Sequence, residues 1–533
     1  MREYAKLKEG GQQPWRLDRG DVTNTGFGPW GGLLRSVLLM LCAGTLYGFG
    51  SYSETLVDAL VDANATSCGS IEACDGAVQV ISASGNAGMW TNIAGGLLYD
   101  RRGFRATVIA GSFLTLLGYG GMLLALSQHA ILQHISAYVL CPFWFAAGHG
   151  SGYYFMAAMW SGVKKFKCKH HGFAIGMLSS LFGLSSTLFL QLFEGCVGGR
   201  LLPDDRCVGG FLGGDLTSYM LFCTVLVPAA GAGAALSDPK GERPSYPKQA
   251  RSRFASVSSC ILCLICALAT SSVLSSRQFF PKIRTWSPIA VLSILVITIA
   301  VLAGFEAASW RTDGAAPIDV KGADVKCAPS ATLRAAARTD RFWYLCCAHA
   351  PTVAGAVLSL NISADIVKAF LNISDESAAK EQAESCVRLA MSMDAIARFS
   401  VGIAMYSFDH NKLPRTRILI AAPVFLIMSH LLLWFAPSST SSLYLAMVCL
   451  GFADALSWAT TPWLTKHAFG VEHSAAILGS ITLVVAFFSV IFGFAVQPAL
   501  LRSQSDMLAS TNILHLTLGT FALMAAVLLD RKT

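Results

Sequence analysis

Long apolar runs alternate with short polar segments along almost the whole chain. Each run has about 20 residues, the length that crosses a lipid bilayer as an α-helix. Six runs precede the polar stretch DPKGERPSYPKQARSR, two follow it, and six more follow a long hydrophilic segment. The pattern predicts an all-α polytopic membrane protein with about 14 transmembrane helices. The predicted spans are residues 33–57, 77–98, 106–126, 136–160, 173–194, 216–236, 255–275, 287–305, 342–362, 387–408, 417–436, 443–464, 474–499 and 512–529.

The outer runs form two blocks of six helices that resemble each other. AYVLCPFWFAAGHGSGYYFMAAMW in the first block corresponds to SLYLAMVCLGFADALSWATTPW in the second, and a helix containing Gly and Ser follows each. Two parallel repeats of this kind place a substrate site between them near the membrane midplane. The pattern therefore favours a transporter made of two six-helix bundles with an extra central hairpin. Its expected parts are a cytoplasmic tail (1–32), an N-terminal bundle (33–236), a cytoplasmic loop (237–254), the hairpin (255–305), a cytoplasmic linker (306–341), a C-terminal bundle (342–529) and a tail (530–533).

Composition narrows the class of protein. Hydrophobic residues make up 54% of the chain and charged residues only 14%, which excludes a soluble multidomain enzyme. The net charge of +8 is spread over short segments between the apolar runs, whereas a nucleic-acid partner would need it in one stripe. The sequence has no Gly-x-x-x-x-Gly-Lys-Ser/Thr loop and no nucleophile motif beside its His and Asp residues. We therefore expect no nucleic-acid partner, no cofactor and no enzymatic activity.

The charges of the connecting loops predict the orientation. Cytoplasmic loops are rich in Lys and Arg, and DRRGFR, KKFKCKHH, KGERPSYPKQARSR, DHNKLPRTR and the terminal DRKT fall on the side of the N-terminal tail. The basic loop RQFFPKIR, between the two middle runs, disagrees. The N-terminal tail is polar over about 30 residues, so the first apolar run should stay as a membrane helix. We expect a multi-pass protein of the plasma membrane or an endomembrane, with both termini in the cytoplasm.

Sequons and cysteines agree with this orientation. N-glycosylation sequons begin at Asn64, Asn361 and Asn372, all on the predicted non-cytoplasmic side. Disulfides persist on that side of a membrane. Two pairs of cysteines lie in loops there and are candidate disulfides, with free thiols as the alternative: Cys68 with Cys74, and Cys196 with Cys207.

The stretch GLLYDRRGFR, residues 96–105, resembles the signature loop of the major facilitator superfamily, with the pattern Gly-x-x-x-Asp-Arg-x-Gly-x-Arg. Gly96 permits a close approach between helices, and Gly103 permits a tight turn. Asp100 can cap a helix, or pair with Arg101 or Arg105 in one conformation and release them in the other. A loop that only set the orientation would need just the basic residues. We therefore expect these five residues to form a gating loop.

Further segments resemble the nodulin-like branch of this superfamily. They are GTLYGFGSYSETL, ISASGNAGMW, GSFLTLLGYGGMLLAL and GFAIGMLSSLFGLSSTLFLQLF. The resemblance covers residues 30–236 and, more weakly, 333–500, and it departs at His171-Gly172, where the family tends to have Arg-Gly. It implies a multi-pass carrier of a small solute. Members of the branch have been linked to organic acids and to iron or other metals.

Ionisable residues inside membrane spans are costly and therefore mark candidate functional sites. His149 and Asp454 lie at comparable places in the fourth helix of each block. In the superfamily the first and fourth helices of each block line the cavity, which implies that Tyr47, Glu54 and His349 share one space with them. A carboxylate and an imidazole in a cavity can exchange protons near neutral pH. The pair His149 and Asp454 could instead bind a divalent transition metal.

Other assignments stay open at this stage. His149 and His349 could each be a hydrogen-bonded core histidine, and His430 is more typical of a core or interface position. Asp394 and Arg398 are one helical turn apart, so they form either a structural ion pair or an anion site centred on Arg398.

The sequence thus predicts a secondary active transporter of a small polar molecule or ion that works by alternating access, as a symporter or antiporter, with a proton as candidate coupling ion. Candidate substrates are an organic anion such as a monocarboxylate, or iron or another transition metal for export. The alternative is a membrane sensor or scaffold that keeps the transporter fold and binds a cytoplasmic partner through the linker, residues 306–341.

Overall fold

The computed structural model describes residues 29–63, 65, 68, 70–134, 136–164, 170–192, 216–237, 261–262, 264–266, 270, 330–411, 415–436, 438–492, 496 and 507–532. Within these ranges the regular secondary structure is helical, without strands. Eight of the described helical segments are long and apolar enough to cross a membrane. Most of the predicted central hairpin, residues 255–305, and most of the linker before residue 330 lie outside the described residues, so the count of about fourteen spans stays a prediction.

The first half of the chain forms a bundle around α4, α5 and α7. Its helices are α2 (Pro29–Ala43), η2 (Thr45–Ser51), α3 (Ser53–Asp62), α4 (Ile71–Trp90), α5 (Ile93–Ser127), α6 (His129–His134), η3 (Ala137–Val139), α7 (Leu140–Lys164), α8 (His171–Leu192) and α9 (Leu216–Leu236).

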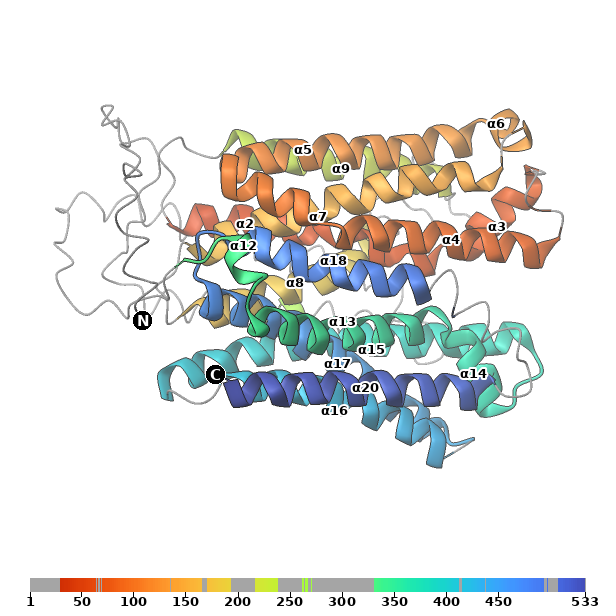
Figure 1. The fold of residues 1–533 in the computed structure, drawn as a ribbon. Coiled ribbons are helices and arrows are strands. Elements are labelled where there is room, and N and C mark those ends of the chain that lie inside the picture. Colours follow the sequence, from red (N-terminus) through yellow and green to blue (C-terminus); the bar gives the residue numbers. More distant parts are fainter. Residues whose placement is uncertain are drawn as a thin grey trace.

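The second half repeats the arrangement. Its helices are α12 (Leu333–Ala336), α13 (Asp340–Asn361), α14 (Ser363–Leu371), α15 (Glu376–Asn411), α16 (Thr416–Phe435), α17 (Thr440–Phe469), α18 (Ser474–Ile491) and α20 (Met507–Lys532). Figure 1 shows the two bundles side by side with their long helices running in roughly the same direction.

Local sequence signals set several helix ends. The side chains of Ser70, Thr339 and Ser439 each accept a hydrogen bond from a backbone amide in the first turn of α4, α13 and α17. Gly103, with φ of 78°, makes a sharp turn between the two helical segments that together form α5. The turn expected at Gly103 is thus present, because glycine adopts positive φ without steric cost.

The first predicted span, residues 33–57, differs from the structure. The α-helix ends at Ala43, a 3-10 segment follows, and a new α-helix begins at Ser53. The break coincides with Gly44, where an added Cβ would collide with the backbone of Phe182 in α8. α8 therefore crosses the first span so closely that only glycine fits, and Tyr47 lies on the 3-10 segment beside this crossing.

The two halves meet mainly through three helix pairs. α8 packs on α15, while α4 and α5 pack on α18. In chain order α4 and α15 follow the first spans of their halves, and α8 and α18 are the fifth spans of theirs, so corresponding helices of the two repeats make corresponding contacts. This is the arrangement expected for parallel repeats with a site between them.

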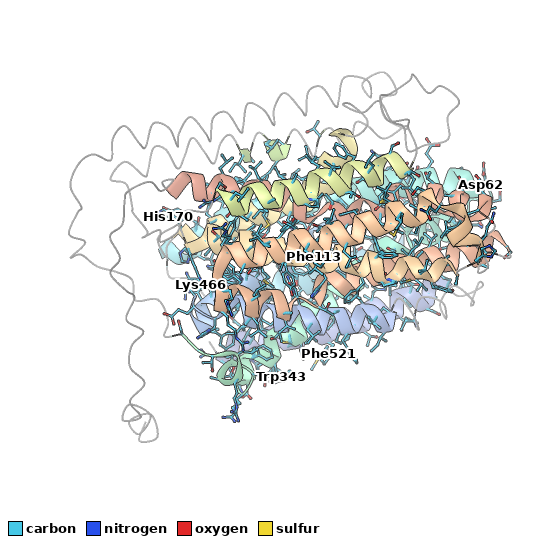
Figure 2. The ribbon with its side chains drawn as sticks, turned by 90° about the horizontal axis from the view of Figure 1, so that it is seen from above. Asp62, Phe113, His170, Trp343, Lys466 and Phe521 are labelled. Atoms are coloured by element: carbon cyan, nitrogen blue, oxygen red, sulfur yellow. A yellow bond between two sulfur atoms is a disulfide. The ribbon has the colours of Figure 1, made fainter. Side chains whose placement is uncertain are left out.

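The two ends of the molecule differ. His170 and Lys466 lie at one end and Asp62 lies at the opposite end in Figure 2. The first end, which also carries the end of α20 and the C-terminus, is called the basic end below. Figure 1 shows α3, α6 and α14 together at the other end, called the sequon end because Asn361 and Asn372 lie there on α13 and at the end of α14.

Two predictions concern the sequon end. A disulfide joins Cys68 to Cys74, as expected, whereas Cys196 and Cys207 lie outside the described residues. Asn361 and Asn372 are exposed, and Asn64 lies outside the described residues. Glycosylation of the three sequons stays a prediction.

Large apolar side chains cover the outer surface between the two ends. Phe113 on α5 is 65% exposed and Phe521 on α20 is 49% exposed, and Figure 2 shows both between the basic end and the sequon end. A soluble protein rarely exposes such a continuous apolar surface. Lipid chains would solvate it, which agrees with a multi-pass membrane protein.

Candidate functional site

Three charged side chains meet inside the second half. The guanidinium of Arg398 on α15 donates from Nε to Asp394 Oδ1 and from Nη2 to Asp454 Oδ2 on α17, each at 2.8 Å. Arg398 and Asp394 are 2% and 3% exposed. A charge in a membrane interior is tolerated when it is paired and hydrogen-bonded. The three side chains, called the ion triad below, therefore form one unit.

The ion triad contains polar atoms that the protein does not satisfy. Arg398 Nη1 and Asp454 Oδ1 are buried and have no hydrogen-bond partner. A buried donor or acceptor without a partner costs about 1–3 kcal/mol, and more when the group is charged. One free donor and one free acceptor thus remain at a site where each should have a partner, as expected for a site that takes a ligand.

The first half of the protein closes over the ion triad. A Cβ added to Gly183 of α8 would lie 2.8 Å from Asp394 Oδ2, so this helix passes directly over the carboxylate. Tyr47 of η2 lies within electrostatic range of the triad, and its ring packs edge-to-face on Phe182 with centroids 5.5 Å apart. The triad therefore faces the junction between the two halves.

His349 lies beside the ion triad. Its Nδ1 hydrogen bonds to Ser457 Oγ at 2.7 Å, and its ring stands perpendicular to that of Trp458 with centroids 5.0 Å apart. Ser457 is one helical turn after Asp454 on α17, and His349 is close enough to Arg398 to interact electrostatically. The buried Nε2 of His349 has no hydrogen-bond partner, so it adds a third free polar atom to the site.

A small cavity lies between the halves. Residues of α4, α7, α17 and α18, together with Asn92, line it, and one of them, Trp458, contacts His349 through its ring. The lining residues are Met89, Trp90, Asn92, Gly152, Phe155, Met156, Trp458 and Thr482.

Two expected site residues are not among these contacts. The Nδ1 of His149 is 3.0 Å from the Gly88 carbonyl on α4, and its ring packs on Phe145 and Tyr153 of its own helix. The structure thus gives His149 partners within the first bundle and does not pair it with Asp454. Glu54 is on α3, and its side chain lies outside the described part of the structure.

The expected gating loop lies at the basic end. Asp100 Oδ2 accepts a hydrogen bond from the backbone N–H of Ala476, 2.9 Å away, in the first turn of α18. A carboxylate is favourable at a helix N-terminus because of the helix dipole and the free N–H groups. Of the two arrangements expected for Asp100, this structure contains the helix cap, and Arg101 and Arg105 are exposed. Gly96 packs so closely on α18 that an added Cβ would collide with the Ala475 carbonyl.

Replacing Asp100 with alanine should loosen the contact between α5 and α18. Loss of a cap costs about 1 kcal/mol, or roughly a fivefold shift toward the state open at the basic end. The separation between unnatural-amino-acid labels at the exposed positions Arg102 and Glu472 measures this shift. Asp62→Ala at the sequon end is the control, and an unchanged label separation in Asp100→Ala would exclude the cap as a contact that holds this end closed.

The same end is closed by a second contact, between α8 and α15. Gly176 and Gly402 face each other so closely that a Cβ on Gly176 would collide with Gly402 Cα. Nearby, the ring of His170 stacks on that of Tyr406 with centroids 5.3 Å apart. Glycine at a helix crossing lets two backbones approach, so the contact depends on the absence of a side chain.

Gly176→Leu should therefore favour the state that is open at the basic end. Overpacking costs about 1–3 kcal/mol, or a shift of about 10- to 100-fold. Labels at Arg102 and Glu472 should move apart further than in Asp100→Ala. Gly233→Leu on α9 is the matched control because no atom lies within 4 Å of its added Cβ. Equal label separations in both leucine variants would contradict the role of the α8–α15 crossing.

Sequence reasoning placed Asp394 and Arg398 together but did not anticipate that Asp454 binds the same guanidinium. The two residues are 56 positions apart and belong to different helices. Gly183, which lets α8 approach Asp394, was also missed, because a glycine in a Gly-rich helix has no local feature that distinguishes it.

Comparison with known proteins gives the family. A family model described as Nodulin-like matches residues 29–303, just over half of the chain. No curated protein sequence matches this chain.

Solved structures show the fold. One similar structure is that of the major facilitator superfamily proton:xylose symporter XylE bound to 6-bromo-6-deoxy-D-glucose, with a TM-score of 0.54, 14% identity, and 93% of this chain and 94% of that chain covered. Another is the human organic anion transporter MFSD10 (TETRAN), with a TM-score of 0.52, 12% identity, and 93% and 98% covered. At these identities the likeness shows the fold alone. The chain therefore belongs to the Nodulin-like family and has the fold of a major facilitator superfamily transporter.

Proposed function

We propose that this protein is a proton-coupled transporter of a small organic anion, with Arg398 as the anion-binding group and Asp454 as the proton site. The observation that carries this proposal is the ion triad, in which one buried guanidinium is held by two carboxylates and both Arg398 and Asp454 keep a free polar atom. Alternating access would proceed by rocking of the two bundles about this site.

The charges of the ion triad link the proton to the anion. With both carboxylates ionised, the triad has a net charge of −1, so it repels an anion. A proton on Asp454 makes the triad neutral and weakens the bond from Arg398 Nη2 to Asp454. The guanidinium can then offer two N–H groups to a carboxylate in the planar geometry that arginine favours. In this scheme the proton binds first, and the anion follows.

Asp454 suits the proton role better than Asp394. The side chain of Asp454 is 16% exposed and keeps one oxygen free, whereas that of Asp394 is 5% exposed and lies under Gly183. A proton that enters from the junction between the halves reaches Asp454 first. His349 would then contact the bound anion through its free Nε2.

The geometry favours an anion over a metal ion. The metal site expected from His149 and Asp454 would need both side chains at one place, but His149 bonds to Gly88 and Asp454 bonds to Arg398. The described residues contain no group of three or more His, Cys, Asp or Glu side chains that could hold a metal ion. A guanidinium next to Asp454 would also repel a cation.

Several finer assignments belong to the same proposal. The loop from Gly96 to Arg105 would act as the gate at the basic end, and this end would face the cytoplasm with both termini. The membrane would be the plasma membrane or an endomembrane. If the protein were instead a sensor or scaffold, residues 306–341 would bind a cytoplasmic partner.

Uptake into proteoliposomes tests the function. The full-length protein is reconstituted, and accumulation of radiolabelled monocarboxylates and dicarboxylates is compared at equal pH and with an acidic exterior, with ferrous iron and xylose as comparison solutes. We expect one carboxylate to accumulate above equilibrium only with the proton gradient, with matching acidification of the lumen. Uptake of iron alone would indicate a metal carrier, and no uptake of any solute would favour a sensor.

A further inference from the structure

A short connection at the basic end contains three exposed arginines. Arg334 lies on α12, Arg338 in the turn after it and Arg341 in the first turn of α13. Together they are called the arginine corner below. In the part of the chain that the structure describes, neither Arg334 nor Arg338 forms an ion pair. Because the three arginines are so close in the chain, their charges add up at one place and attract an anion.

Contacts on both sides hold the arginine corner in place. Before it, the backbone N–H of Ala331 donates to the carbonyl oxygen of Phe469 at the end of α17, 2.8 Å away, and α12 packs on α18. After it, Arg341 Nη2 donates to the carbonyl oxygen of Lys532, 2.7 Å away, and the Lys532 ammonium pairs with Asp340. The connection is therefore fixed against α17, α18 and α20, and its arginines have a defined arrangement.

Trp343 indicates where the membrane surface lies. Its indole Nε1 donates to the carbonyl oxygen of Ala337, 2.9 Å away in the turn after α12, while the side chain is 54% exposed. Tryptophan is enriched at the interface between membrane and water, because it joins a large apolar ring to a polar N–H. Figure 2 shows Trp343 on the same side of the molecule as the lipid-facing Phe521. The arginine corner thus lies at the level of the phospholipid headgroups.

An apolar stripe on α20 runs toward the arginine corner. It consists of Phe521, Met524 and Leu528, which are all exposed and lie on one face of the helix because they are three and four residues apart. Lys532, four residues after Leu528, continues the same face and is bound to Arg341 through its carbonyl oxygen. The stripe therefore passes from apolar side chains to cations, in the same order as the acyl chain and phosphate of a phospholipid.

We propose that the arginine corner binds the phosphate of an anionic phospholipid, with an acyl chain along the stripe of α20. Guanidinium groups bind phosphate through paired N–H donors, and basic clusters beside a membrane attract anionic lipids. A soluble acidic protein would contact the arginines but not the stripe or Trp343. The residues of this site all belong to the second half, away from the ion triad, so the site does not depend on what the protein transports.

Native mass spectrometry of the full-length protein in detergent micelles tests the proposal. Phosphatidylglycerol and phosphatidylcholine are titrated separately, and the apparent Kd of the first bound lipid is measured for each. An arginine beside an anionic headgroup raises the affinity about fivefold, so three arginines should make phosphatidylglycerol bind about 100-fold more tightly than phosphatidylcholine. Equal Kd values for the two lipids would overturn the proposal.

Paired substitutions locate the headgroup. Arg334→Gln together with Arg338→Gln should raise the apparent Kd for phosphatidylglycerol about 25-fold and leave that for phosphatidylcholine unchanged. Arg101→Gln together with Arg102→Gln is the matched control, because it removes two exposed arginines from the gating loop, which lies at the same end. Equal weakening in the two double variants would show that only the total charge of the basic end matters, and would contradict a site at the arginine corner.

Two further measurements test the acyl chain. Glycerol 3-phosphate has the phosphate without acyl chains, so a molar excess should displace little phosphatidylglycerol. Met524→Gln places a polar group in the stripe and should weaken phosphatidylglycerol binding several-fold, whereas Met428→Gln, an exposed methionine on α16, should not. Complete displacement by glycerol 3-phosphate, or equal Kd values in the two methionine variants, would contradict a lipid that lies along α20.

Discussion

Arg398→Gln should abolish transport of the organic anion. The substitution removes the buried guanidinium and leaves Asp394 and Asp454 facing each other without a counter-ion. Truncating one partner of a buried charge pair costs about 2–5 kcal/mol, which corresponds to a loss of about 30- to several-thousand-fold. Initial uptake rates in proteoliposomes measure the effect.

Arg388→Gln is the matched control. Arg388 lies ten residues earlier on the same helix and makes the same kind of one-turn pair, with Glu384, but the two side chains are 24% and 33% exposed. Such a pair contributes only about 0.3–0.5 kcal/mol, so transport should change by less than about threefold. Comparable losses in the two variants would show that Arg398 supports the helix and not the anion.

A double variant separates binding from folding. Arg398→Gln together with Asp454→Asn removes the guanidinium and one of the two carboxylates, so one unpaired carboxylate remains. We expect the double variant to fold better than Arg398→Gln and still to transport no anion. Restored anion uptake in the folded double variant would contradict the assignment of Arg398.

Asp454→Asn should uncouple transport from the proton gradient. The asparagine resembles the protonated aspartate in shape and charge, and it leaves Arg398 and Asp394 as a neutral one-to-one pair. The anion-competent form then exists at every pH. In the wild-type protein uptake should rise as the exterior becomes more acidic, because protonation of Asp454 frees Arg398. In the variant we expect uptake to be independent of pH and accumulation above equilibrium to be lost, while downhill exchange of the anion continues.

The measurement compares proton-driven accumulation with counterflow at equal pH in the same vesicles. Asp58→Asn, an exposed carboxyl on α3, should leave both activities unchanged. If Asp454→Asn keeps a pH-dependent accumulation equal to that of the wild-type protein, the proton binds elsewhere. Loss of counterflow together with accumulation would instead mean that Asp454 contacts the anion itself.

Much of the fold could be predicted from the pattern of apolar residues. The runs at 106–126, 216–236 and 417–436 correspond to described helices, because a lipid-facing helix must be apolar over about 20 residues. α15 begins at Glu376 instead of residue 387, since its first turns are polar and carry no hydropathy signal. The break at Gly44 could not be predicted, because its cause is α8, which is more than 100 residues away in the chain.

The site could be predicted only in part. The spacing of Asp394 and Arg398 is a local property, since one helical turn brings the two side chains together. The bond between Arg398 and Asp454 depends on how α15 and α17 pack, and helical spacing within one segment contains no information about it. His149 also shows that local spacing does not reveal contacts between helices. Asp454 occupies the corresponding position in the second repeat, but the packing of α7 on α4 makes the Gly88 carbonyl the partner of the His149 ring.

The sequence by itself determined that this chain is a membrane protein of two repeated bundles, with a charged loop at residues 96–105 and ionisable residues inside its spans. Hydropathy, loop charge and motif spacing are properties of neighbouring residues, and the bilayer acts on each segment in the same way. Only the tertiary structure decided which of the ionisable residues meet. The rotation and crossing of the packed helices bring Arg398 to Asp454 and the ring of His430 to that of His515, and a change of a single residue in helix register would separate both pairs.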